Sequence, residues 1–554
     1  MAPNIKRTLL SLSEKGIWSL QAQHGCFGYS PGKIVPLPKA YCAPNYMKWL
    51  INEAVKRYLN MRMKRIEHYM LHPEETQELW LRKIIDRGRT TEFGKRYDFA
   101  SITSAETFKS KVPSHEYDGL KNDIGRMMHG EKNVLWPGEV NWYSKSSGTT
   151  SDKSKFIPVP YGNLFNCHLA GIWDSLALLY ANKPDMAAFQ YKHLVVPGSF
   201  QHLPEYPKTK LGDVSAILVQ HMPTIGKMFY TPDFQTVLQP NFEEKLHKIA
   251  DITSKQNDIV LFGGVPTWLI VLFRMILEKT GKNNMLEVWP NLQAYMHGGV
   301  SFEPYRETFK ALIPSDKFVY QEIYNASEGY FGAQCDLGQN DMLLLVNNGV
   351  FYEFVPLEEW NKENPKTVLL SDVKLGELYA IMITGNNGLY RYLPGDTVVF
   401  TRKYPFCIQI AGRTKQFINA FGEEVMVGDT DKALADACRK LNAVVSEYTA
   451  APVYFSSDHN KGGHEWVIEF DREPADLALF SRVLDESLQR INSDYEAKRY
   501  KGMALEPLSL RRVPRGTFLR WMRARGKFGN QNKVPRLANH RRFVEEVVRY
   551  QLEV

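Results

Sequence analysis

The sequence is poor in cysteine and has no cysteine pair at metal-binding spacing. Its 554 residues include six scattered cysteines, at Cys26, Cys42, Cys167, Cys335, Cys407 and Cys438. Such scattering argues against a disulfide framework and against a zinc site, and it favours reduced thiols. We therefore expect a protein of the cytoplasm.

Long hydrophobic runs are also missing. The most apolar stretch, Ile259 to Phe273, is bracketed by Asp258 and Arg274 and interrupted by Pro266. It is shorter than the roughly 20 residues that a membrane-spanning helix needs. We interpret this stretch as a buried strand, a turn and then a core helix, and we expect no insertion into a membrane.

A strong charge imbalance is absent as well. The net charge is +8, with 44% hydrophobic and 23% charged residues, which are ordinary values for a globular protein. The modest positive charge suits an anionic ligand, but by itself it favours neither nucleic acid nor a membrane. A chain of 554 residues is too long for one core, so two or more domains are expected.

Residues 1–46 differ from the rest of the chain, because Pro and Gly interrupt them and no periodicity is sustained. We expect a poorly defined N-terminal extension there. A transit peptide, a flexible extension and translation from an upstream start are the interpretations that remain open. Met47 then opens a basic amphipathic helix that runs to about Leu71. Such a helix either lies on a membrane or, more often, covers a core.

The next part of the chain has the alternating pattern of an α/β fold. Expected helices at Leu164–Leu179 and Phe242–Thr253 alternate with expected strands at Leu194–Val196 and Val214–Val219. This alternation is typical of parallel strands with helical connections. The sequence therefore predicts a large domain of mixed sheets and helices.

Further along, the apolar period changes to two. Leu343–Val346 and Val350–Val355, joined by Asn347-Asn348-Gly349, predict a hairpin, and an antiparallel meander or barrel-like part continues to Phe400. We expect a large N-terminal domain over residues 47–411, after the extension 1–46. A small, mobile α/β domain is expected over residues 412–554.

One stretch, Trp142 to Pro158, is dense in hydroxyl-bearing side chains around Gly148. Hydroxyls, freed backbone N–H groups and a lysine such as Lys155 are suited to a polyphosphate. The Gly-x-x-x-x-Gly-Lys-[Ser/Thr] spacing of a Walker A loop is absent. From composition alone, a solvated loop and a phosphate-binding loop are both open.

Polar and small residues also follow the later strands. The strand that ends near His297 continues into Gly298 and Gly299, and the strand from Tyr320 continues into small residues and Glu328. Ligands of open α/β sheets sit at such strand ends. His297 is either catalytic or a hydrogen-bonded structural histidine.

Three stretches, taken in order, resemble the signature motifs of one enzyme family. They are Ser146-Ser147-Gly148-Thr149-Thr150, Tyr324-Asn325-Ala326-Ser327-Glu328 and Tyr390-Arg391-Tyr392-Leu393-Pro394-Gly395-Asp396. The family is that of the auxin-responsive acyl acid–amido synthetases, which belong to the adenylate-forming superfamily. These plant enzymes and their bacterial relatives couple carboxylic acids to amino acids. The resemblance extends from about Met47 to the C-terminus.

The resemblance implies roles for individual residues. Tyr324 would stack on adenine, Asp396 would accept both ribose hydroxyls and Glu328 would act in catalysis by holding Mg²⁺. Lys533, in its Asn-x-Lys-Val-Pro-Arg setting, is similar to the family's C-terminal catalytic lysine. The residues implied to bind ATP are Ser146, Ser147, Gly148, Thr149, Thr150, Lys155, Tyr324, Asn325, Ala326, Ser327, Asp396 and Arg413. Gly298 and Gly299 would border the acyl pocket, with a helix over Pro266–Leu272 as one wall.

Two positions depart from the family pattern. Asp152 stands where many members have Gly, which places a carboxylate close to the phosphates, and Asn325-Ala326-Ser327 replaces the commoner Ala-Ser-Ser.

The resemblance implies a ligase that uses ATP and Mg²⁺. It would adenylate a carboxylic acid of aryl or indolyl type and pass the acyl group to an amino acid. Its partners would then be these small molecules, without nucleic acid or membrane, and the protein would be a monomer or a weak homodimer. One alternative keeps the adenylation and uses coenzyme A as acceptor. The other is a basic nucleic-acid-binding protein that uses the arginine-rich tract from Arg511 to Arg542.

Overall fold

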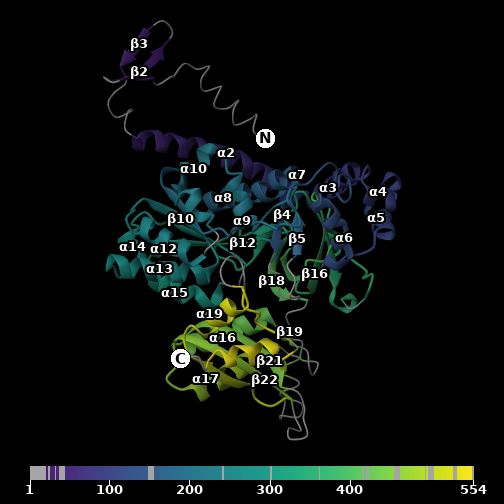
Figure 1. Ribbon diagram of the computed structural model, residues 1–554, viewed down its shortest axis with the longest axis vertical. Helices are drawn as coiled ribbons and strands as arrows, with labels where there is room; N and C mark the ends of the chain where they lie inside the picture. Colours follow the sequence, from purple (N-terminus) through teal and green to yellow (C-terminus); the bar gives the residue numbers. More distant parts are fainter. Residues whose placement is uncertain are drawn as a thin grey trace.

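A computed structural model describes residues 20–22, 25–30, 33–36, 44–146, 155–239, 242–299, 302–360, 362–414, 417–418, 423, 425–453, 462–492, 495–496, 499, 505–527, 533–538 and 540–551. Figure 1 shows a large body, with helix α2 (Pro44–Leu71) along one side, and a smaller lobe of C-terminal residues at the opposite end. A small antiparallel sheet, which the sequence pattern did not predict, precedes α2; its strands are β1 (Leu20–Ala22), β2 (Gly25–Ser30) and β3 (Lys33–Pro36). Within the described residues, no helix is both long and apolar enough to cross a membrane.

An eleven-stranded sheet in the described residues forms the centre of the large body, in the order β15-β16-β17-β18-β14-β13-β12-β11-β10-β6-β9. The strands β9, β6, β10, β11 and β12 run parallel to their neighbours, as the alternating pattern predicted. From β12 onward each neighbouring pair is antiparallel. The strands are β6 (Lys192–Val195), β9 (Tyr230–Thr231), β10 (Ile259–Gly264), β11 (Ala294–His297), β12 (Val319–Asn325), β13 (Tyr330–Ala333), β14 (Met342–Leu344), β15 (Val350–Pro356), β16 (Leu378–Gly385), β17 (Asp396–Arg402) and β18 (Cys407–Arg413).

Helices cover both faces of this sheet. One face packs against α2 and α8 (Leu169–Asn182), and the other against α12 (Phe242–Thr253), α13 (Pro266–Thr280) and α15 (Arg306–Leu312). Helix α13 begins at Pro266, whose missing N–H costs nothing in a first turn, and it buries Leu269, Leu272, Phe273 and Ile276 at helical spacing. The expected strand, turn and core helix over Ile259–Phe273 are therefore confirmed.

Close packing of α8 on the sheet depends on a glycine. A Cβ atom built on Gly171 would lie 2.3 Å from the ring of Tyr330 on β13. The hydroxyl of that tyrosine shares a 2.6 Å hydrogen bond with Ser175, one turn further along α8. Helix and strand are thus joined by packing and by a buried polar contact.

Two sequence-based expectations in this body are wrong. Val214–Val219 lies in helix α9 (Val214–Gln220), not in a strand; a fully buried helix and a fully buried strand both give a continuous apolar run. The expected hairpin of Leu343–Val346 with Val350–Val355 does not form, because β14 pairs with β13 and β18 whereas β15 pairs with β16. The Asn-Asn-Gly turn therefore connects β14 and β15, which pair with other strands of the sheet and not with each other.

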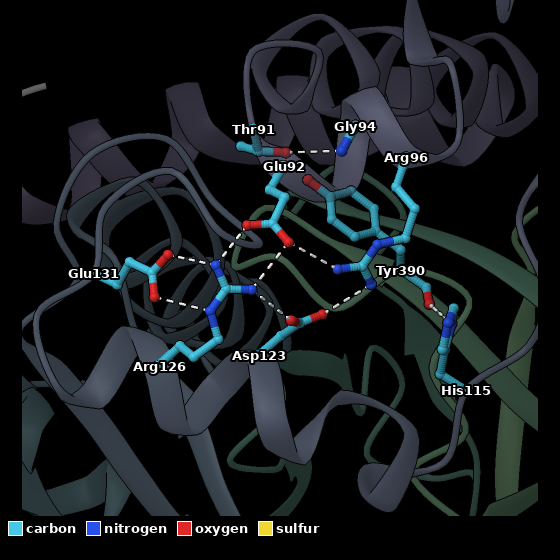
Figure 2. A network of polar contacts seen from close by, with 9 residues as sticks. All are labelled: Thr91, Glu92, Gly94, Arg96, His115, Asp123, Arg126, Glu131 and Tyr390. Carbon is cyan, nitrogen blue, oxygen red and sulfur yellow. Dashed lines mark hydrogen bonds and ion pairs between the residues drawn. The ribbon is translucent and has the colours of Figure 1, made fainter.

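A layer of helices joins the start of the large body to its last strands. It contains α3 (Pro73–Gly88), α4 (Glu92–Arg96), α5 (Ala105–Lys111) and α6 (Tyr117–Met128). Figure 2 shows that Arg126 of α6 lies between the carboxylates of Glu92 and Glu131, with both of which it pairs. In the same view, Nδ1 of His115 is 3.0 Å from the carbonyl oxygen of Tyr390, the first residue of the third motif. The helical layer therefore helps to place that motif.

The small lobe has cores of its own. A three-stranded sheet of β21 (Val444–Val453), β22 (Gly463–Arg472) and β23 (Ser509–Val513) packs with α16 (Val427–Lys440) and α17 (Leu477–Ile491), and helices α19 (Thr517–Ala524) and α20 (Arg542–Arg549) complete it. This arrangement, together with the mixed sheet of the large body, confirms the predicted fold class.

Candidate active site

A single large cavity brings together most of the described residues that the sequence singled out. Its volume is about 3810 Å³, several times the roughly 300–1,000 Å³ of a site for one small ligand. Residues of both the large body and the small lobe line it. Those from the predicted site are Gly298, Gly299, Tyr324, Asn325, Ala326, Ser327, Glu328, Asp396 and Lys533.

Tyr324 and Asp396 are in direct contact in this cavity. Tyr324 is near the end of β12 and Asp396 is the first residue of β17, and the tyrosine hydroxyl donates a 2.6 Å hydrogen bond to Oδ2 of the aspartate. Both residues are buried, at 6% and 8% exposure. Tyr324 also lines the cavity, and its ring lies 5.0 Å from that of Phe331 in an edge-to-face arrangement, so the hydroxyl orients a carboxylate at the cavity wall.

The chain reverses directly after β12, and this turn carries Glu328. Ala326 and Gly329 exchange backbone hydrogen bonds of 2.9 and 3.3 Å across it. Ser327, inside the turn, accepts a 3.0 Å hydrogen bond from Ser144 of strand β4 (Trp142–Ser146). The strand that leads into the hydroxyl-rich stretch therefore contacts the second motif directly.

Several predicted residues lie outside the described part of the chain. They are Ser147, Gly148, Thr149 and Thr150, together with Asp152, and the side chains of Ser146 and Arg413 are also undescribed. The backbone of Arg413 on β18 is opposite Asp396 on β17. Lys155, on strand β5 (Lys155–Pro158), is opposite Ser146 in the register of β4, and it is not among the described residues that line the cavity.

Lys533 reaches from the small lobe to the turn after β11. Gly299 has a φ of +85°, and a Cβ atom built there would lie 3.5 Å from Nζ of Lys533. Glycine is favoured at such a positive φ, and here it also leaves the space that the ammonium group approaches. The structure thus brings the predicted catalytic lysine to one of the predicted acyl-pocket glycines.

His168 supports the second motif, although no pattern in the sequence predicted it. Its Nδ1 lies 3.1 Å from Oδ1 of Asn325, whereas its Nε2 has no hydrogen-bond partner among the described residues. Burial lowers the pKa of His168 to about 4, while the contact with Asn325 opposes that shift. The imidazole is therefore neutral near pH 7 and donates to the asparagine.

His297 has the environment of a structural residue. Its ring stacks on Phe302 with 4.2 Å between the centroids, and burial lowers its pKa to about 3. The ring packing favours a structural role, but Nδ1 of His297 is buried without a hydrogen-bond partner among the described residues, so the hydrogen bond expected of a structural histidine is not found at that atom.

The third motif is anchored by a buried ion pair that sequence reasoning also missed. Nε of Arg391 donates to both carboxylate oxygens of Glu353, at 3.1 and 3.0 Å, and its Nη1 donates to the carbonyl of Val112 at 2.7 Å. Arg391 and Glu353 are 2% and 1% exposed. Arg391 therefore holds the segment in front of Asp396 and does not face a ligand.

The donor set suits a metal that is bound mainly through a substrate. Among the described residues, no group of three or more His, Cys, Asp or Glu side chains is placed to hold an ion. Glu328 offers one carboxylate at the cavity wall. One or two carboxylates together with phosphate oxygens are the usual ligands of Mg²⁺, so the residues present fit this ion.

Comparison with known protein families agrees with this geometry. Family models for the N-terminal, central and C-terminal domains of the GH3 family match residues 62–318, 343–413 and 428–542. The chain belongs to the GH3 family. The resemblance to the auxin-responsive acyl acid–amido synthetases is thereby confirmed.

Individual GH3 relatives extend the match over most of the chain. Indole-3-acetic acid-amido synthetase GH3.3 of Arabidopsis thaliana is 24% identical over 561 residues, which cover 87% of this chain and 92% of the relative. The solved structure of the GH3.15 acyl acid amido synthetase superposes with a TM-score of 0.73 at 15% identity, covering 89% of this chain and 96% of that one. A 2-hydroxyisobutyryl-CoA ligase in the postadenylation state, at a TM-score of 0.52 and 12% identity over 85% of this chain and 90% of that one, shares the fold.

The arginine-rich tract of this GH3 protein is largely compensated by carboxylates. Ion pairs join Arg511 to Glu465, Arg512 to Glu473, Arg515 to Asp471, Arg541 to Glu465 and Arg542 to Glu546. Positive charge that is paired within the lobe contributes little attraction for a phosphate backbone.

Proposed function

We propose that this GH3 protein is a cytoplasmic, ATP-dependent acyl acid–amido synthetase. In the first step a carboxylate oxygen of the acid attacks the α-phosphorus of ATP, and the bond to pyrophosphate breaks. In the second step the nitrogen of an amino acid attacks the acyl carbonyl, loses a proton and displaces AMP. The observation that carries the proposal is the meeting of Tyr324, Glu328, Asp396 and Lys533, from distant parts of the chain, around one cavity.

The nucleotide would lie at the ends of β12 and β17. Asp396 would accept the two ribose hydroxyls, and the face of Tyr324 would pack on adenine. The stretch from Ser146 to Thr150, with Lys155 and Arg413, would bind the phosphates through hydroxyl, backbone and cationic groups. Asn325, Ala326 and Ser327 would border the adenosine, with Asn325 held in place by His168.

Two charged residues would act at the reacting phosphate. Glu328 would hold Mg²⁺, which when bound supplies positive charge to the phosphate oxygens. Lys533 would place its ammonium beside the acid carboxylate and the α-phosphate, next to Gly298 and Gly299. Its contact with Gly299 supports this role, because a positioned cation stabilises charge that develops during the transfer.

The acid would be of aryl or indolyl type. Aromatic side chains from several elements line the cavity: the ring of Trp173 stacks on Phe189 at 6.1 Å, and Phe229 meets Phe189 edge-on at 5.4 Å. Aromatic walls of this kind favour a planar ring through stacked and edge-to-face contacts. The small lobe, residues 412–554, would close over residues 47–411 as a lid that excludes water.

Pyrophosphate release tests the proposal directly. ATP, Mg²⁺ and a panel of aryl and indolyl acids should give acid-dependent pyrophosphate, and adding amino acids should give an amide that mass spectrometry identifies. Coenzyme A in place of amino acids is the comparison, since a CoA ligase shares the fold. A thioester with no amide would move the assignment to a CoA ligase, and the absence of both ATP binding and pyrophosphate release would refute it.

A further inference from the structure

The small lobe touches the large body through a side chain that lies just beyond Lys533. Nη2 of Arg536 donates a 2.9 Å hydrogen bond to the hydroxyl of Tyr305. Tyr305 ends the short helix η5 (Glu303–Tyr305), which follows the glycine turn of β11, and it is 3% exposed. This hydrogen bond therefore joins the two parts of the protein at a buried point.

Arg536 is fixed firmly on its own lobe. Its guanidinium forms a 2.6 Å ion pair with Glu447 and lies 4.6 Å from the ring centroid of Tyr448. The hydroxyl of Tyr448 in turn donates to Asp431 of α16 at 2.7 Å. An arginine held by a carboxylate and by an aromatic face has little freedom to point elsewhere.

The backbone between Lys533 and Arg536 is tied to the same strand. The amide of Ala450 on β21 donates to the carbonyl of Arg536 at 2.8 Å, and Oγ1 of Thr449 donates to the carbonyl of Pro535 at 2.7 Å. Arg536 is three positions after Lys533, a span of at most about 10 Å. Holding Arg536 in place therefore limits the positions that the side chain of Lys533 can occupy.

Two contacts therefore join one short segment of the large body to one short segment of the small lobe. On the large body they lie at Gly299 and Tyr305, and on the small lobe at Lys533 and Arg536. We propose that the hydrogen bond between Arg536 and Tyr305 is a latch that positions Lys533 beside Gly299 for the adenylation step. In this proposal both latch residues act through Lys533 and are therefore positioning residues. The role in adenylation rests on the proposed function.

A second contact between the lobes provides a contrast. Arg274 of α13 pairs with Asp471 of β22 through two nitrogen–oxygen contacts of 3.2 and 2.8 Å. The arginine side chain is 41% exposed, and ion pairs at exposed sites contribute little. The latch, in contrast, lies beside the lysine and away from solvent.

The test is Tyr305→Phe, which keeps the ring and its packing but removes the hydroxyl. The matched control is Tyr352→Phe: Tyr352 is buried on β15, is not among the described residues that line the cavity, and loses only a hydroxyl that donates to the carbonyl of Leu345 at 3.4 Å. The first measurement is the reactivity of Lys533 toward an N-hydroxysuccinimide ester, followed by mass spectrometry in the absence of substrates. The second is the rate of acid-dependent exchange of pyrophosphate into ATP, with indole-3-acetate as the acid, resolved into kcat and KM.

Tyr305→Phe should raise the labelling of Lys533 several-fold and lower kcat for exchange about tenfold, since hydrogen bonds to charged groups are among the stronger ones. KM for ATP should stay within about twofold, and Tyr352→Phe should change neither readout. Unchanged labelling, or increased labelling with an unchanged kcat, would overturn the latch. If the wild-type protein exchanges no pyrophosphate with any acid, the proposed function fails, and the labelling alone then decides whether the hydrogen bond positions Lys533.

Discussion

Tyr324 and Asp396, 72 residues apart in the chain, share a 2.6 Å hydrogen bond that joins the end of β12 to the start of β17. Strand β12 is parallel to β11 and antiparallel to β13, so Tyr324 is close to the point at which the sheet changes its strand direction. Ligands of open α/β sheets bind outside the carboxyl ends of the strands, and Tyr324 lies close to that end of β12. The hydrogen bond therefore marks where the two halves of the sheet meet at the site.

Replacing this tyrosine tests the proposed nucleotide pocket. Tyr324→Phe keeps the ring for adenine and removes the donor that orients the Asp396 carboxylate. A hydrogen bond to a charged group contributes about 1.5–3 kcal/mol, so we expect the KM for ATP to rise at least about tenfold while kcat changes less. Tyr352→Phe, which removes a buried hydroxyl from β15, is the matched control. Equal KM values for the two variants would contradict the role of Asp396.

If Lys533 has the proposed role, replacing it should slow adenylation and leave the folded structure intact. Lys533→Ala should slow acid-dependent pyrophosphate exchange about a hundredfold or more, by analogy with the loss of one positioned charge-stabilising donor. Lys432→Ala removes another lysine that borders the same cavity from the small lobe, and it should leave the exchange nearly unchanged. Exchange at the wild-type rate in Lys533→Ala would remove the lysine from the mechanism.

Acid should destabilise the protein through His168. Its folded-state pKa of about 4 lies below the ordinary 6.5, so between these values the unfolded state binds a proton that the folded state does not. Stability should therefore be fully present above pH 6.5 and fall as the pH drops toward 4. His168 alone should account for about 2 kcal/mol at pH 5.

Urea unfolding at pH 5 and pH 7.5 measures this effect. His168→Gln keeps a donor for Asn325 and cannot take up the proton, so the difference between the two pH values should shrink by about 2 kcal/mol. His68→Gln, at an exposed position on α2, should leave the difference unchanged. The same pH dependence in the wild type and in His168→Gln would show that the histidine is not kept neutral by burial.

The pair of Arg391 and Glu353 should matter for stability more than for chemistry. Glu353→Ala leaves a buried guanidinium without its carboxylate and should cost about 3–5 kcal/mol of unfolding free energy in urea denaturation. The double replacement Arg391→Met with Glu353→Met removes both charges and should recover much of that loss. A double variant no more stable than Glu353→Ala would mean that the pair also holds a backbone conformation, since Arg391 has a φ of +43°.

Local elements could be predicted well from sequence, because their signals are local. Helix α12 spans the predicted residues Phe242–Thr253, and α13 begins at Pro266 as its first-turn proline indicates. The run Val214–Val219 failed because every residue in it except Ser215 is buried, which removes most of the polar half of the helical period. The hairpin failed because strand pairing in this sheet is decided by strands far along the chain.

The residues of the candidate site also fall into two groups, those that local sequence signals predicted and those that they did not. Residues at strand ends, such as Glu328 and Asp396, could be found from motifs, because the chain itself places them at turns. His168 could not, since it acts on Asn325 across 157 residues, and neither could Tyr305, which meets Arg536 across 231 residues. Contacts of this kind depend on how the elements pack, and no periodicity in the sequence records them.

Lys533 approaches Gly299, although the two residues are far apart in the sequence. A Cβ atom at position 299 would lie in ordinary van der Waals contact with the lysine, at 3.5 Å from Nζ, so the positive φ of +85° is what favours glycine there. Homologues that share this turn should accordingly keep a glycine at position 299 whether or not they keep the lysine. The two positions meet in the fold, although 233 residues of sequence lie between them.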